Sequence, residues 1–308
     1  MTEFCAQYSR DVEEPLAGTA EHANQNLLLS WPIGQWTRTY HQAKTMTPEV
    51  SDAVRQLVES GRRVNLMHRA DQPDGVHRAY LMPEQQAFDI PAEQLADFLA
   101  AVQQNQSLEP WSVGPVKHRV MLCCTHGVKD KCCAKFGNAG FKALDLASHA
   151  FPGEFEIWQS THLGGCRLAS SALVFPALRK YGRIEPEQAL ALLESERRDQ
   201  PFLPSYRGDG TLGSVAQIVD IAARNQLQTD GIEPNQIEIL TETPLANGQV
   251  RYQVRWQTEA AAGELRIELE PITSHRYGTC ADIDDAIAPI AHATWQPVVV
   301  QALSVEPR

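Results

Sequence analysis

The residues of this chain most able to do chemistry are its cysteines, and five of the seven lie between Cys123 and Cys166. We expect a cytoplasmic protein, because residues 1–15 carry neither the cationic start nor the apolar run of a secretory signal. Disulfides are rare in that compartment, so clustered cysteines there indicate metal binding or redox chemistry. The sequence therefore predicts a metal or redox site in the middle of the chain.

Soft metal ligands follow two predicted strands, at residues 118–123 and 155–159. If these strands are parallel, their carboxyl ends share one edge of the sheet, where ligand sites tend to form. Glycines in the two following loops would let the backbone approach a cluster closely. The four donors that we expect to converge there are Cys124, Cys133, His162 and Cys166.

The spacing of these donors bears on which metal they bind. Eight residues separate Cys124 from Cys133, which is wide for structural zinc with its close cysteine pairs. The chain has no C-x-x-C pair, so a thioredoxin-type dithiol is excluded. A wide loop suits a dinuclear cluster, so we favour an iron–sulfur cluster, with zinc as the alternative.

We expect the other cysteines of the chain to be structural. Cys123 lies within a predicted strand and Cys132 lies beside a predicted ligand, and we expect both to be small core side chains. Cys5 and Cys280 lie far from the central motifs in sequence, and we expect buried or inert thiols there.

The central motifs resemble a known family. CTHG at 124–127, DKCC at 130–133 and THLGGCR at 161–167 are similar to motifs of the sucrase/ferredoxin-like family of thioredoxin-like 2Fe–2S proteins. Further similarities lie at 14–20, 181–184 and 203–208.

The resemblance implies a thioredoxin-like ferredoxin fold that carries one 2Fe–2S cluster. The first motif of the family falls on Cys124 and Cys133, and the first histidine of its H-x-G-G-H motif falls on His162. Cys166 stands where the second histidine would be, so we expect ligation by three cysteines and one histidine. Such a protein would transfer single electrons between donor and acceptor proteins, at a potential between those of all-cysteine and two-histidine clusters.

Other function classes compete with this hypothesis. A zinc-binding structural or regulatory protein is the main alternative, and a hydrolase with a carboxylate pair is a weaker one, since acidic pairs are usually solvated. No G-x-S-x-G or P-loop occurs. The G-x-G-x-x-G match at 208–213 follows a proline-rich segment rather than a strand, so we interpret it as a loop and helix start.

Charge and hydropathy exclude two kinds of partner. The net charge of −11 repels phosphate backbones, so we expect no nucleic-acid binding. No apolar run approaches the roughly 18 residues that span a bilayer, so we expect no membrane association.

The periodicity predicts an α/β protein with an N-terminal α+β unit, a central βαβ segment and a C-terminal β-hairpin extension. The resemblance implies that the central segment is a thioredoxin-like ferredoxin core. We place these units at 1–115, 116–226 and 227–308, and we find no internal sequence repeat. The predicted strands cover 26–31, 63–68, 76–81, 118–123, 155–159, 169–175, 182–184, 236–240, 250–256 and 264–269. The predicted helices cover 48–61, 91–104, 141–150, 185–196 and 212–225.

Overall fold

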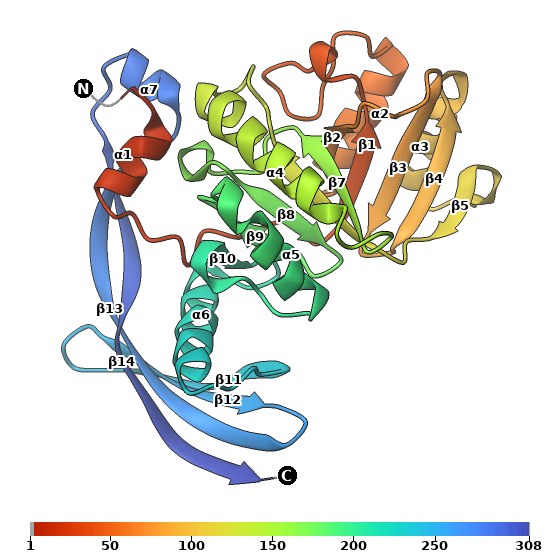
Figure 1. Cartoon of the computed structure of the whole chain (residues 1–308). Coiled ribbons are helices and arrows are strands. Elements are labelled where there is room, and N and C mark those ends of the chain that lie inside the picture. Colours follow the sequence, from red (N-terminus) through yellow and green to blue (C-terminus); the bar gives the residue numbers. More distant parts are fainter. Residues whose placement is uncertain (1–2, 308) are drawn as a thin grey trace.

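A computed structural model describes residues 3–307 of the chain, which form two sheets and their covering helices (Figure 1). The large sheet has ten strands in the order β10-β9-β8-β6-β7-β2-β1-β3-β4-β5, and the small sheet has the order β11-β12-β13-β14. The strands of the large sheet are β1 (Asn26–Ser30), β2 (Arg63–His68), β3 (Val76–Met82), β4 (Gln86–Pro91), β5 (Ser112–Pro115), β6 (Arg119–Cys124), β7 (Phe155–Ser160), β8 (Ala172–Phe175), β9 (Arg179–Tyr181) and β10 (Tyr206–Asp209).

The small sheet and the helices complete the fold. The small sheet consists of β11 (Gln236–Pro244), β12 (Val250–Gln257), β13 (Ala261–Arg276) and β14 (Ile290–Pro307). The α-helices are α1 (Cys5–Asp11), α2 (Pro48–Glu59), α3 (Leu95–Gln103), α4 (Asn138–Ser148), α5 (Ala189–Arg197), α6 (Ser214–Thr229) and α7 (Cys280–Asp284). The predicted α/β class and the β-rich C-terminal extension are confirmed.

Local sequence explains the individual elements well. Every residue of β1 is buried, as expected for an apolar strand in the middle of a covered sheet. Helix α2 begins after Thr47, whose hydroxyl accepts from the Val50 N–H, and has a proline at its first turn. Its buried residues recur at helical spacing and face the sheet.

The large sheet repeats one topology twice. In the first unit β1 is parallel to β2 and antiparallel to β3, which pairs with β4 and then β5. In the second unit β6 is parallel to β7 and antiparallel to β8, which pairs with β9 and then β10. The two units meet where β2 pairs antiparallel with β7, so the strand order is palindromic. The repeat is structural and is not visible as a sequence repeat.

The C-terminal sheet packs on α6. Alternate residues of β12 and β13 are buried, which is the pattern of a sheet with one covered face. Their apolar side chains form one cluster with the buried face of α6. Strands β13 and β14 continue past this cluster as a long hairpin, and α7 at its tip lies beside α1 (Figure 1).

The structure differs from the sequence-based prediction in several segments, and strands β4, β5 and β10 and helices α1 and α7 were not predicted. The predicted strand at 182–184 is wrong, since the strand is β9 and Arg183 adopts a positive φ in the following loop. The predicted strand at 169–175 begins later, at Ala172. Strand β14 was not predicted. The boundaries proposed at 115 and 226 stay predictions, although the large sheet continues across the first of them.

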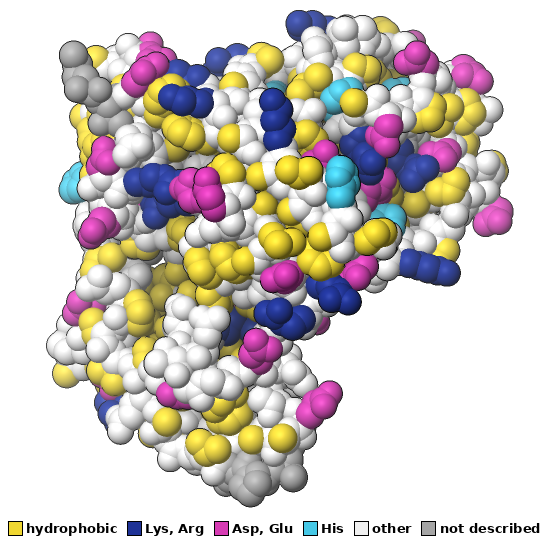
Figure 2. Space-filling model, in the orientation of Figure 1, with side chains coloured by type: hydrophobic (Ala, Val, Ile, Leu, Met, Phe, Trp, Pro, Cys, Tyr) yellow, Lys and Arg dark blue, Asp and Glu magenta, His cyan; other side chains and the backbone are white. Residues whose placement is uncertain are grey.

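Two surface properties bear on partners. None of the helices in residues 3–307 combines the length and the apolar character needed to cross a membrane. On the face shown in Figure 2, acidic and basic side chains are interspersed rather than gathered into one large patch of a single sign.

Candidate metal centre

The four predicted donors lie at the carboxyl ends of β6 and β7. These strands are parallel, as expected, and Cys124 at the end of β6 lies opposite Ser160 at the end of β7. Cys133 begins the turn of helix that leads into α4, and Cys166 begins a short 3₁₀ turn after the His162 loop. The shared sheet edge therefore brings donors from two loops to one place.

The structure brings the four side chains together as two close pairs. The Sγ atoms of Cys124 and Cys133 are 3.5 Å apart, and Cys166 Sγ lies 3.3 Å from His162 Nδ1. Across the pairs, Cys133 interacts with Cys166 and Cys124 interacts with His162. The three cysteines are almost fully buried, whereas His162 is partly exposed.

Hydrogen bonds among these groups favour thiolates. Their interactions with Cys133 lower the pKa of both Cys124 and Cys166, with His162 adding to the effect. The same bonds, together with burial, raise the pKa of Cys133. Burial opposes protonation of His162, but its bonds to Cys124 and Cys166 outweigh burial and raise its pKa to about 9.

Three cations, two of them buried, hold the loop that carries His162. They donate to three consecutive backbone carbonyls: Arg63 Nη2 to His162 at 2.6 Å, Lys180 Nζ to Leu163 at 3.0 Å and Arg207 Nη1 to Gly164 at 3.1 Å. All their hydrogen bonds within residues 3–307 go to neutral oxygens. Burial lowers the pKa of each of them, that of Arg207 to about 9. This end of the sheet therefore gathers positive charge, opposed by the carboxylates of Glu14 and Glu21.

His126 orients the histidine donor. Its Nδ1 accepts from the backbone N–H of His162 at 3.2 Å, so its Nε2 must carry the proton that it donates to the Thr37 carbonyl at 2.7 Å. Arg167, the neighbour of Cys166, forms an ion pair with Glu14 at 2.6 Å.

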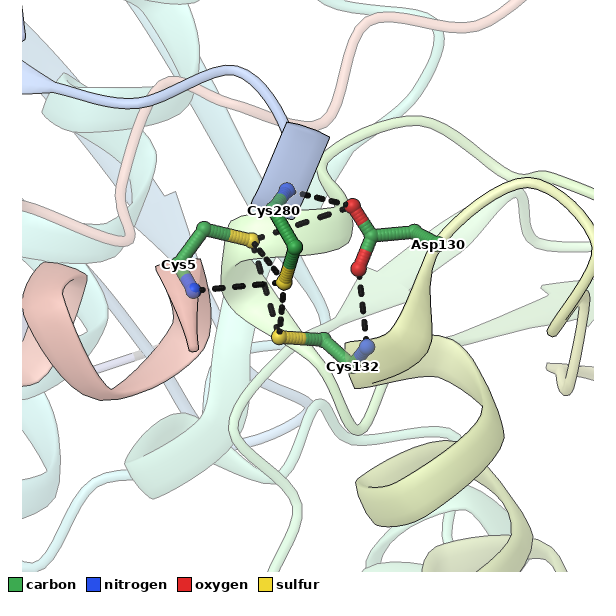
Figure 3. A group of neighbouring side chains, drawn as sticks. All are labelled: Cys5, Asp130, Cys132 and Cys280. Carbon is green, nitrogen blue, oxygen red and sulfur yellow. Dashed lines mark hydrogen bonds between the residues drawn. The ribbon is translucent and has the colours of Figure 1, made fainter. Parts of the chain in front are cut away.

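A second group of soft ligands was missed by the sequence analysis (Figure 3). Cys5, Asp130, Cys132 and Cys280 are all buried, and their ligand atoms lie within 4.8 Å of one another. Cys123 and Cys132 both lie in apolar core clusters, as predicted, but Cys132 in addition belongs to this group of possible ligands. Cys5 and Cys280 share no motif with the central segment, so spacing offers no signal for this group.

The two groups differ in compactness. Among residues 3–307, the Cys5 group is the one set of at least three such donors within 4.8 Å of one another. A compact set suits a single ion, whereas a wider set built from two pairs suits a dinuclear centre, whose two metals each need terminal ligands. The chain thus offers one site of each shape.

Comparisons with known proteins cover curated sequences and solved structures. No curated protein is similar enough in sequence to count as a match. A thioredoxin-like [2Fe-2S] ferredoxin from Aquifex aeolicus is a structural match with 16% identity and a TM-score of 0.28, covering 31% of this chain and 94% of the ferredoxin. The Cys55Ser variant of that ferredoxin matches with 16% identity and a TM-score of 0.26, covering 29% of this chain and 96% of the variant.

The sequence motifs extend over a larger part of the chain. The family model described as sucrase/ferredoxin-like matches residues 16–208. This match includes all four donors of the sheet-edge site and both halves of the large sheet. The chain therefore belongs to the sucrase/ferredoxin-like family.

Proposed function

We propose that this protein binds one [2Fe–2S] cluster through Cys124, Cys133, His162 and Cys166 and transfers single electrons. The observation that carries the proposal is the arrangement of these donors as two close pairs, 3.5 Å and 3.3 Å apart, at one sheet edge. A dinuclear cluster needs two terminal ligands on each iron, and both thiolate and imidazole are known iron ligands in such clusters.

The charge around the donors supports an anionic occupant. A cluster with three thiolates and one neutral imidazole is negatively charged, and when bound it accepts or gives up one electron at a time. Arg63, Lys180 and Arg207 lie around the His162 loop, and none of the three forms an ion pair within residues 3–307. Their positive charge would offset that of the cluster and favour its reduced form.

The surrounding residues would orient the ligands and keep water out. The His126 contact fixes the backbone of His162, and the three cysteines are at most 4% exposed. His162 is the one donor with appreciable exposure, so electron exchange with donor and acceptor proteins would take place on its side of the site.

The experiment is to purify the protein without oxygen, record its visible spectrum, and count iron, sulfide and zinc per chain. We expect a brown protein with about two irons, whose absorption bleaches on reduction. Cys166→Ala should lose most of the iron. Cys123→Ala is the matched control and should keep its iron. Cys123 is an equally buried cysteine on the same strand as Cys124, but it packs in a different core cluster from the three cysteine donors.

The contrary result is also well defined. A colourless protein that stays iron-free after cluster reconstitution, with zinc that Cys166→Ala removes, would mean that the four donors form a zinc site. Electron transfer by this protein would then be excluded.

A further inference from the structure

We propose that Cys5, Cys132, Cys280 and Asp130 bind a single zinc ion, which ties helix α1 and the tip of the β13–β14 hairpin to the loop of the sheet-edge site. This site is separate from the proposed cluster and does not depend on it. The three cysteines come from α1, the loop after β6, and α7 at the tip of the β13–β14 hairpin (Figures 1 and 3).

The sulfur positions fit one tetrahedral ion. The Sγ atom of Cys132 lies 3.1 Å from that of Cys280 and 3.5 Å from that of Cys5, and Cys5 and Cys280 are 3.4 Å apart. Two thiolates on one zinc, with bonds of about 2.3 Å, lie about 3.8 Å apart. A disulfide needs about 2.05 Å. The observed triangle is close to the first value and far from the second.

Asp130 supplies the fourth donor. Its Oδ2 lies 3.9 Å from Cys5 Sγ and accepts from the Cys280 N–H at 2.8 Å, while its Oδ1 accepts from the Cys132 N–H at 2.8 Å. One carboxylate therefore fixes the backbone of two cysteines and still has a lone pair for a metal. Four buried protein ligands form a closed site, as in structural zinc centres.

Backbone N–H groups already point at the sulfurs. The Cys5 N–H donates to Cys280 Sγ and the Ala6 N–H donates to Cys132 Sγ, both at 3.4 Å. Such bonds stabilise thiolate ligands and orient them toward a metal. Three buried thiols packed against a carboxylate form an unusual core, whereas thiolates around a cation give each of these polar groups a partner.

A zinc ion at this site would act as a clamp that holds three segments of the chain together. The clamped segments lie far apart in sequence, and Cys132 directly precedes the predicted cluster ligand Cys133. A metal there would fix the loop that carries this ligand to both α1 and α7. Zinc suits the role because it has no redox chemistry of its own and would not exchange electrons with a neighbouring cluster.

The test is metal counting in a crossed set of variants, with protein produced in zinc-supplemented medium. Wild type should hold one zinc per chain. Cys280→Ala should lose zinc and keep iron, Cys166→Ala should lose iron and keep zinc, and Cys123→Ala should keep both. If iron is absent from every variant but Cys280→Ala still loses zinc, the cluster proposal fails and the zinc proposal stands.

A second measurement guards against variants that do not fold. Zinc-edge X-ray absorption of wild type should show three sulfurs at about 2.3 Å and one oxygen at about 2.0 Å. Wild type that takes up no zinc from added zinc chloride, zinc that persists in Cys280→Ala, or a Cys132–Cys280 disulfide in freshly purified protein would each overturn the proposal.

Discussion

At the scale of single residues, the sheet-edge site depends on buried charge. Arg207 is 3% exposed and donates to the Gly164 carbonyl and to Thr19. A cation in this position costs desolvation free energy, which is consistent with its lowered pKa. We infer that this cost is offset when an anionic group occupies the neighbouring donors.

Arg207→Met should therefore make the cluster harder to reduce. Removing one buried charge near the cluster is worth about 1 kcal/mol, or on the order of 50 mV toward negative potential for one electron. Arg207→Lys keeps the charge and should recover most of the shift. Spectroelectrochemical titration of the two variants checks this, and equal potentials in both would contradict it.

A second prediction about buried charge concerns Glu156, which lies on β7 of the large sheet. Burial disfavours its ionised form, but bonds from His118 and Tyr80 and the charge of Arg69 lower its pKa from 4.5 to about 2. A carboxylate with a depressed folded pKa stabilises the protein above its unfolded pKa, and this contribution is lost as the pH falls from 4.5 toward about 2.

Glu156→Gln should accordingly lower the free energy of unfolding by about 3 kcal/mol at about pH 7. The difference from wild type should narrow below about pH 4.5 and nearly vanish near pH 2. Urea unfolding at several pH values measures it. Glu59→Gln, at an exposed ion pair, should have a much smaller effect, and a difference for Glu156→Gln that does not change with pH would refute the assignment.

At the scale of elements, the helix after the first ligand loop lies very close to the ligand strand. A Cβ added at Gly137 would lie 2.1 Å from the Cys124 carbonyl oxygen. Only glycine lets the start of α4 approach the end of β6 this closely. The distance between Cys124 and Cys133 therefore depends on how closely Gly137 approaches the end of β6.

Gly137→Ala should push the two segments apart, lower the free energy of unfolding by about 1–3 kcal/mol and reduce the iron content. Gly213→Ala is the matched control, because it also precedes a helix, has a negative φ and has nothing within 4 Å of an added Cβ. Denaturant unfolding and iron counting compare the two. Full iron content in Gly137→Ala would show that the loop tolerates the shift.

At the scale of the whole molecule, the two sheet units make unequal contributions. Residues 6–122 contain no cysteine, so the first unit has no thiolate at its own strand ends. It instead contributes a cation to the site on the second unit. The antiparallel pairing of β2 with β7 places Arg63, at the start of β2, beside the His162 loop.

Removal of the proposed zinc should loosen helices α1 and α7 and leave the large sheet intact. After treatment with a chelator, hydrogen exchange should quicken in α1, in α7 and in the loop at 128–133, because these are the segments that the ion would join. Strands β1 to β4 should keep their protection. Faster exchange throughout the large sheet, or no change in α1 and α7, would contradict a clamp.

The sequence predicted the local features of this protein. Strand and helix periodicity located most elements of the sheet, and soft donors after two apolar strands located Cys124, Cys133, His162 and Cys166. The element predictions succeeded because each rests on neighbours within a few residues. The four donors lie together because parallel strands end at one edge, and their role as ligands stays a prediction.

Only the tertiary structure decided which distant segments meet. Cys5 and Cys280 reach Cys132 because α1 folds onto the ligand loop and a long hairpin carries α7 back to it. The carbonyl contacts of Arg63 and Arg207, and the twofold repeat of the sheet, likewise follow from strand order and register. The side-chain contacts among them join residues from 43 to 148 positions apart. No local spacing records them, because pairing between distant strands is fixed by the packing of the whole chain.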